Sequence, residues 1–266
     1  MTTATIPAGA HGGVRNALSD SLTMIGRSIR LVRRNPDTLL MSIVLPLMLM
    51  ALFVYVFGGA IDTGGAYLNY VVPGIIVLCT GYGAASTAMS VADDMTSGVI
   101  DRLRSMPIRT FAVLTGHVVA SSARNALSTT IIIGAAIAMG FRPDATPLQW
   151  LATAALLLLY VLALSWIAAG FGVIARSVES ASVFSFFMLF LPYLSSAFVP
   201  TETMPAFLQP VSEHQPITPL IETARGLLTG MPVDADTAWI AVAWCVGLLA
   251  LSFTFATALY RRRTRR

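Results

Sequence analysis

The chain has 266 residues, of which 56% are hydrophobic and only 11% are charged. A soluble domain carries about 25% charged residues, so this composition indicates an integral membrane protein with little soluble mass. The net charge of +4 does not point to a nucleic-acid partner, because all seventeen basic residues are arginines that cluster as membrane topology would place them.

The N-terminal region precedes the first long apolar run. Residues 1–15 are small and polar, and we expect them to be disordered. They do not resemble a cleavable signal peptide, since no apolar core follows a basic start. Residues 16–34 alternate apolar and arginine positions at helical spacing, which predicts an amphipathic helix lying on the membrane surface.

The remainder of the chain predicts an all-α transmembrane domain, so that residues 16–266 form one unit. Each apolar run is long enough to cross about 30 Å of hydrocarbon. We expect spans at 38–57, 68–92, 110–140, 148–175, 181–199 and 238–260.

The arginine distribution predicts the orientation of these six spans. If the N-terminus is cytoplasmic, fourteen of the seventeen arginines fall in cytoplasmic segments, and the outer loops carry only Arg142 and Arg225. This bias satisfies the positive-inside rule. We therefore expect a multi-pass protein of the plasma membrane with both termini in the cytoplasm.

Residues 93–109 form a charged stretch between two nearly uncharged spans. They include three aspartates and three arginines, so they must lie in water or among headgroups. Their apolar positions recur at the spacing of one helix face, and Pro107 would end that helix. Asp94 or Thr96 would cap its start. The pattern predicts a short docking helix, with a helix that contacts only lipid as the alternative.

The sequence contains no pattern for catalysis by this chain alone. The phosphate-binding loop G-x-x-x-x-G-K-[ST] requires a lysine, which the chain lacks. Cys79 and Cys245 lie in apolar runs and are expected to be packing residues. The three histidines are far apart in sequence, and no metal site is predicted.

Three segments together resemble the membrane subunits of type-2 ABC exporters, including the daunorubicin-resistance-type permeases. The first is Asp94-x-x-x-Gly98 followed by Leu103 and Pro107, where that family usually has Glu at the Asp94 position. The second, residues 195–205, reads SSAFVPTETMP. The third is His214-Gln215-Pro216 followed by Arg225 and Gly230. The resemblance covers residues 16–260.

The resemblance implies a specific role for the charged stretch. A separate ATPase subunit would bind ATP and Mg, and this chain would hold no cofactor. The stretch would be the coupling helix that docks on this ATPase, with a second membrane subunit, identical or related, completing the pathway. Its candidate coupling residues are Asp94, Gly98, Arg102, Leu103, Arg104 and Pro107.

Arg124 is the one arginine placed deep within a predicted span. An unpaired arginine at the centre of a membrane helix costs about 2.5–3.5 kcal/mol on insertion scales. It would therefore face the transport pathway or a subunit interface. Alternatively, the span begins later and Arg124 reaches back to the cytoplasmic headgroups. Nearby His117 is expected at the membrane interface.

Segment 200–230 is proline-rich but too apolar for a free loop. The resemblance implies re-entrant helices that gate the outer exit, with Pro216, Glu222 and Arg225 as candidate gate residues. Glu222 and Arg225 are spaced i, i+3 and would form a structural pair or, alternatively, contact substrate.

Three functions are compatible with these observations. The first is the membrane subunit of an ATP-driven exporter of hydrophobic or amphiphilic drugs, natural products or lipids, with a lipid-linked glycan as the alternative cargo. The second is an ATP-independent channel or secondary transporter, which would normally carry several ionisable groups near the midplane. The third is a membrane anchor or assembly factor. Only Arg124 is deeply placed, which favours the first.

Overall fold

A computed structural model describes residues 25–28, 36–61, 66–98 and 110–265. Every regular element in these ranges is a helix, as the composition predicts. The long helices are α2 (Pro36–Ala51), α3 (Tyr67–Thr96), α5 (Thr110–Ala138), α6 (Pro147–Ile174), α7 (Val178–Phe190) and α10 (Ala235–Arg265). The shorter elements are η1 (Leu52–Phe57), η2 (Leu191–Leu194), η3 (Thr201–Thr203), α8 (Gln209–His214) and α9 (Ile217–Thr229).

Four described helices are long and apolar enough to cross a membrane. They are Leu39–Phe57, Tyr67–Thr96, Pro147–Ile174 and Ala235–Thr264. Helix α5 occupies the third predicted span but carries His117 and Arg124 and is not among these four. The fifth predicted span, 181–199, contains only a shorter apolar helix, Val178–Leu194. Membrane crossing by α5 and α7 therefore stays a prediction.

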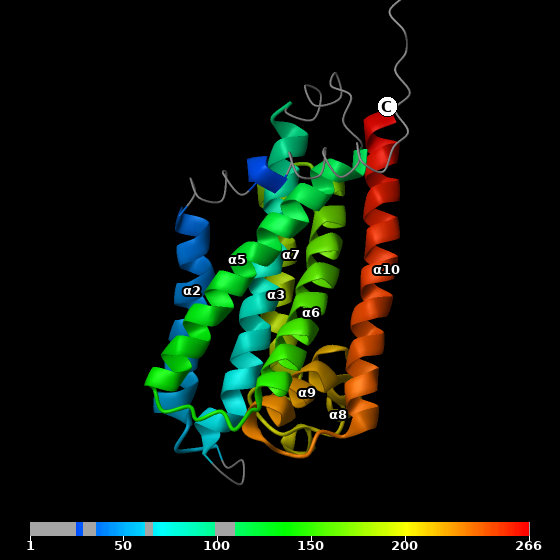
Figure 1. Cartoon of the computed structure of the whole chain (residues 1–266). Coiled ribbons are helices and arrows are strands. Elements are labelled where there is room, and N and C mark those ends of the chain that lie inside the picture. Colours follow the sequence, from blue (N-terminus) through cyan, green and yellow to red (C-terminus); the bar gives the residue numbers. More distant parts are fainter. Residues whose placement is uncertain (1–24, 29–35, 62–65, 99–109, 266) are drawn as a thin grey trace, which may run out of the picture.

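The long helices form a bundle around α3 and α6 (Figure 1). These two helices are largely buried, whereas α2 and α10 leave most of their surface exposed. The close contact of α3 and α6 depends on Gly172, where a Cβ atom would lie 2.5 Å from the carbonyl oxygen of Ala88. Small residues at helix crossings allow this approach in membrane bundles.

Local sequence signals set several helix ends. Thr146 and Gln149 form a capping box at the start of α6, and Ser177 and Ser180 form another at the start of α7. Gly230, with φ +70°, ends α9 in the left-handed conformation. These signals place turns where the sequence predicts breaks between apolar runs.

Different segments of the chain lie at the two ends of the bundle. The start of α2, the end of α3 and the end of α10 lie at one end, and α8 and α9 lie at the opposite end (Figure 1). Arg263 of α10 donates to the carbonyl oxygens of Val173 and Ala175 at the end of α6. The segments predicted to share the cytoplasmic side therefore share one end of the bundle wherever they are described.

Candidate functional site

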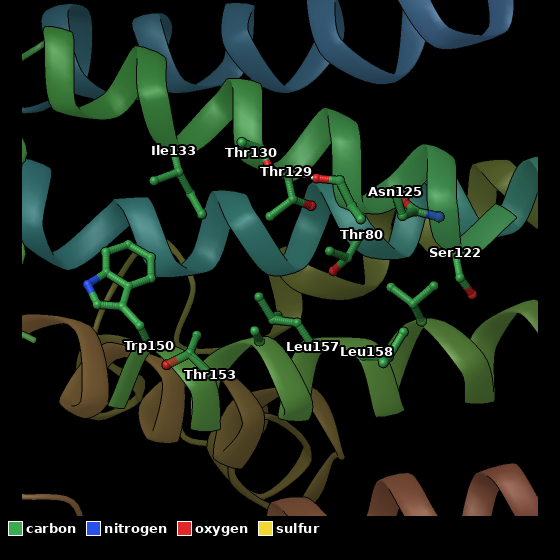
Figure 2. Close-up of a pocket in the computed structure, with 13 residues that line it drawn as sticks. Thr80, Ser122, Asn125, Thr129, Thr130, Ile133, Trp150, Thr153, Leu157 and Leu158 are labelled. Carbon is green, nitrogen blue, oxygen red and sulfur yellow. Dashed lines mark hydrogen bonds between the residues drawn. The ribbon is translucent and has the colours of Figure 1, made fainter. Parts of the chain in front are cut away.

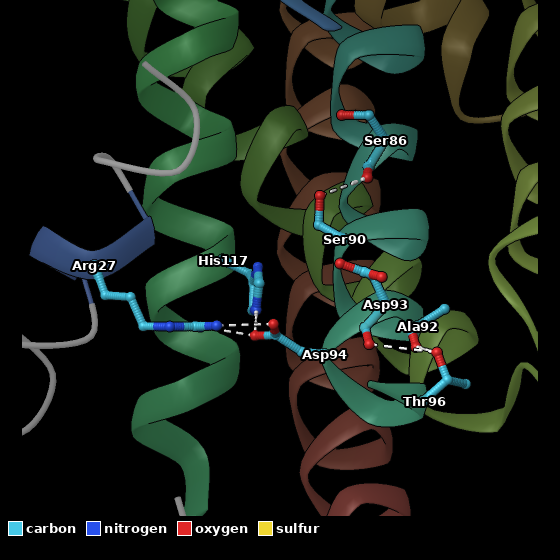
Figure 3. A network of polar contacts seen from close by, with 8 residues as sticks. All are labelled: Arg27, Ser86, Ser90, Ala92, Asp93, Asp94, Thr96 and His117. Atoms are coloured by element: carbon cyan, nitrogen blue, oxygen red, sulfur yellow. Dashed lines mark hydrogen bonds and ion pairs between the residues drawn. The ribbon is translucent and has the colours of Figure 1, made fainter. Parts of the chain in front are cut away.

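Asp94 is the centre of a polar cluster. The cluster lies at the end of the bundle where α2 begins and α10 ends. Its Oδ2 and Oδ1 accept hydrogen bonds from Nη1 and Nη2 of Arg27 at 2.7 and 2.8 Å (Figure 3). Nε2 of His117 lies 2.9 Å from Oδ2 of the same carboxylate. Asp94 is only 5% exposed, so this cluster is sheltered from solvent.

The cluster joins three segments that are separate in the sequence. Arg27 belongs to the short helical turn at 25–28, Asp94 to the last turns of α3, and His117 to the first half of α5. The two-pronged contact with the guanidinium is the strong, directional form of an ion pair. The hydrogen bond from Arg27 to Asp94 raises the pKa of the arginine, which keeps Arg27 charged.

The structure contradicts the predicted start of the docking helix. Helix α3 continues to Thr96, so Asp93–Thr96 extend the second span and do not start a separate helix. The prediction that Asp94 or Thr96 caps a new helix is therefore wrong, since both lie within α3. Asp94 points into the bundle, where it anchors the beginning of the charged stretch and offers no surface to a partner subunit.

Gly98 follows α3 and has φ +76°, a conformation that side-chain-bearing residues adopt at a cost. It turns the chain out of α3, and nothing lies within 4 Å of the position a Cβ would take. The other candidate coupling residues, Arg102, Leu103, Arg104 and Pro107, lie outside the described residues.

Arg124 lies near the middle of α5 and is 7% exposed. Its Nη2 donates to the hydroxyl of Ser86 and to the carbonyl oxygen of Gly83 on α3. Within residues 25–28, 36–61, 66–98 and 110–265, no carboxylate forms an ion pair with it, and its Nε has no hydrogen-bond partner. The side chain therefore points across to α3 within the bundle.

Arg225 lies on α9 at the opposite end and acts as a clamp. Its Nε donates to the carbonyl oxygen of Tyr70 at 3.1 Å, and its Nη2 donates to that of Ser196 at 2.6 Å. The guanidinium carbon also lies 3.8 Å from the centre of the Tyr70 ring. The expected pair with Glu222 does not form, because Glu222 is exposed and Arg225 binds backbone carbonyls instead. Pro216 occupies the N-cap position of α9 and makes no side-chain hydrogen bond there.

Two cavities lie along α3. One of about 250 Å³ is lined by residues of α2, α3 and α7: Met41, Ser42, Tyr82, Gly83, Ser86, Met89 and Ser185. The other, of about 350 Å³, lies between α3, α5 and α6 (Figure 2). Its polar lining comprises Thr80, Ser122, Asn125, Thr129, Thr130 and Thr153. Among the described residues, no group of three or more His, Cys, Asp or Glu side chains would hold a metal ion.

Sequence reasoning missed the contact between His117 and Asp94, because it expected His117 at the membrane interface. The contact joins positions 23 residues apart in different helices, and no periodicity within one helix predicts it. The serines beside Arg124 gave a partial signal, since Ser121 and Ser122 mark the polar face of α5 that packs toward α3 and α6.

Long apolar helices packed around buried polar side chains define a multi-pass membrane protein. Residues 20–229 match the model of the ABC-2 type transporter family, and the chain belongs to this family. It is 30% identical to the daunorubicin resistance ABC transporter permease protein DrrB1 of Streptomyces coeruleorubidus, over 97% of this chain and 92% of that protein.

Two further relatives have similar descriptions. The probable doxorubicin resistance ABC transporter permease protein DrrC of Mycobacterium tuberculosis is 24% identical over 96% of this chain and 92% of its own length. The inner membrane transport permease YadH of Escherichia coli is 27% identical over 69% of this chain and 74% of its own. The family that the sequence resembles is thereby confirmed for the chain as a whole.

Proposed function

We propose that this chain is the membrane subunit of an ATP-driven exporter that moves hydrophobic or amphiphilic compounds out of the cytoplasm or the inner leaflet. Membership of the ABC-2 family and two relatives described as anthracycline-resistance permeases support this function. A separate ATPase subunit supplies the energy and holds ATP and Mg, and this chain supplies the path through the bilayer.

Coupling between the two subunits takes place at residues 93–109. The observation that carries this proposal is the Asp94 cluster, which fixes the start of the charged stretch to both the 25–28 turn and α5. A force applied by the ATPase to the stretch beyond Gly98 would reach α3 and α5 through this cluster. Arg102, Leu103, Arg104 and Pro107 form the surface that docks on the ATPase.

The topology has six spans with both termini cytoplasmic, and α5 and α7 cross the membrane with the four longer apolar helices. The end of the bundle that carries Asp94 faces the cytoplasm under this topology. Helices α8 and α9 then lie at the outer face, where Pro216, Glu222 and the Arg225 clamp belong to the exit gate.

A second membrane subunit completes the pathway. Helix α2, the following η1 and helix α7 carry the large exposed apolar side chains that such a partner would cover, among them Met48, Tyr55, Phe186 and Phe187. A continuous apolar surface of this kind is suited either to lipid or to another membrane helix. We propose that the two subunits meet along this face.

Co-expression with an ABC ATPase subunit from the same organism tests the proposal directly. The expected result is a stable complex in detergent, and ATP hydrolysis that rises on addition of an amphiphilic drug. Replacing Leu103 with Asp should abolish the rise or the assembly, because a charge on the docking face opposes burial. The same change at Leu148, an exposed residue in the first turn of α6, is the control.

Transport by this chain without any ATPase would contradict the proposal and favour a channel or secondary transporter. A Leu103→Asp complex that assembles and remains fully stimulated would show that the stretch does not couple. Export of a lipid-linked glycan by the assembled complex would keep the mechanism and change the cargo.

A further inference from the structure

Among the residues that the structure describes, Arg124 is a buried cation without a carboxylate counter-ion, and a cavity between helices lies beside it. We infer that Arg124 and the adjoining cavity between α2, α3 and α7 bind the acidic group of an anionic amphiphile. This inference rests on the proposed function, because it states a chemical property of the molecule that the exporter takes up.

The charge of Arg124 is incompletely compensated. Its hydrogen-bond acceptors are a serine hydroxyl and a backbone carbonyl, both neutral, and its Nε lacks a partner. The acidic residues of α3 are not available, since Asp93 and Asp94 lie about 10 Å or more beyond Ser86 along the helix axis. Asp94 is also already bound by Arg27 and His117.

A buried arginine inside a membrane bundle is costly and therefore usually serves a function. Its fork of donors suits carboxylate and phosphate oxygens, and an anion would recover electrostatic energy that neutral acceptors do not supply. The desolvated surroundings strengthen this attraction compared with water.

The cavity of about 250 Å³ adjoins this cation through shared residues. Gly83 and Ser86, the two residues that Arg124 contacts, both line it. Ser185 of α7 lines the opposite side, and its buried hydroxyl has no hydrogen-bond partner. A ligand oxygen could therefore meet donors from both α5 and α7.

The rest of the lining suits the apolar part of an amphiphile. Met41 and Met89 border the cavity, and Met41 is 58% exposed, so the cavity opens on the face where α2 leaves the bundle surface uncovered. Methionine side chains adapt to ligands of different shapes. A headgroup would lie near Ser86 and Ser185, with the chain passing out beside Met41.

Photo-crosslinking of the ATPase-bound complex in neutral lipid nanodiscs tests the inference. Three probes share one diazirine-bearing alkyl chain and differ in the headgroup: a phosphate, an uncharged glucoside and a trimethylammonium. We expect the phosphate probe to label peptides containing Met41, Met89 or Ser185 about tenfold more than either other probe.

Matched variants locate the effect. Arg124→Gln should reduce phosphate labelling about tenfold, and Arg124→Lys should retain most of it, because it keeps the charge. Arg176→Gln, at an exposed position, should label like the wild type. Ser185→Leu leaves Arg124 intact but fills the cavity, and it should also reduce labelling.

Adding phosphatidylglycerol to the nanodiscs shows whether the bound anion is a phospholipid headgroup or a single-chain cargo. Competition by this lipid identifies a phospholipid headgroup as the occupant, and undiminished labelling identifies a single-chain cargo. Equal labelling by all three probes, or full labelling of a folded Arg124→Gln complex, would overturn the inference. Labelling needs no ATP, so a complex that binds the phosphate probe but is never stimulated by cargo would refute only the proposed exporter.

Discussion

Arg27 and Asp94 are 67 positions apart in the chain, yet each terminal nitrogen of the arginine donates to a different oxygen of the carboxylate. This pair attaches residue 27 to the last turns of α3, at the second residue of the charged stretch 93–109. Any movement of that stretch relative to the bundle is therefore constrained near its start.

Replacing Asp94 with Asn should destabilise the protein by about 2 kcal/mol, because the part-buried Arg27 guanidinium loses its ion pair and His117 loses its carboxylate partner. Asp93→Asn makes the same chemical change at the exposed neighbouring position and should have little effect. Thermal unfolding in detergent, followed by size-exclusion chromatography, measures both. Equal stability of the two variants would show that the cluster contributes nothing to the fold.

Gly98→Ala should weaken coupling while leaving the bundle folded. A left-handed alanine costs about 1–2 kcal/mol, so the chain would leave α3 in another direction in most molecules. We expect cargo-stimulated ATP hydrolysis to fall about fivefold, in line with that cost. Gly59 does not have a positive φ, and nothing lies within 4 Å of the position its Cβ would take. Cargo-stimulated ATP hydrolysis by Gly59→Ala should therefore be normal. Unchanged stimulation in Gly98→Ala would rule out this conformational requirement.

Gly172→Ala should separate α3 from α6. Its new methyl group would lie 2.5 Å from the Ala88 carbonyl oxygen and 2.8 Å from Val91, and neither backbone can move alone. Overpacking of this kind costs about 1–3 kcal/mol. Gly247→Ala on α10 has open space and should be neutral or slightly stabilising. The melting temperatures of the two variants should therefore shift in different directions or by clearly different amounts.

Arg225→Lys should destabilise the protein by about 2 kcal/mol although it keeps the charge. A lysine cannot donate to the Tyr70 and Ser196 carbonyls while stacking on the Tyr70 ring. Arg142 donates to two carbonyls from one nitrogen, a geometry that lysine can reproduce, so Arg142→Lys is the control. Limited proteolysis at the α8–α9 end would report the loss of the clamp. A protected Arg225→Lys variant would contradict this role.

The resemblance in sequence indicated the family, and the apolar runs indicated where the helices lie. The ends of two helices differ from the predicted ones. Helix α3 runs past Ala92 to Thr96 because the Asp94 carboxylate pairs with Arg27 within the bundle and does not need water to solvate it. Helix α7 ends at Phe190 and passes into a 3-10 turn at Leu191, where Pro192 lacks the N–H that a continuing α-helix needs. The paired charge of Asp94 therefore sets the end of α3, and Pro192 sets the end of α7.

The sequence alone indicated the class of protein, since so few charges and such long apolar runs suit a bilayer, and its order of motifs pointed to the ABC-2 family that the comparison shows. It also marked Asp94, Arg124 and Arg225 as unusual. Only the tertiary structure decided their partners: Asp94 binds Arg27 and His117, and Arg225 binds backbone carbonyls. In the part of the chain that the structure describes, no carboxylate pairs with Arg124. The physical reason is that a charge in a low-dielectric bundle is governed by whichever groups other helices bring within about 4 Å, and the packing of helices, not local spacing, sets those distances.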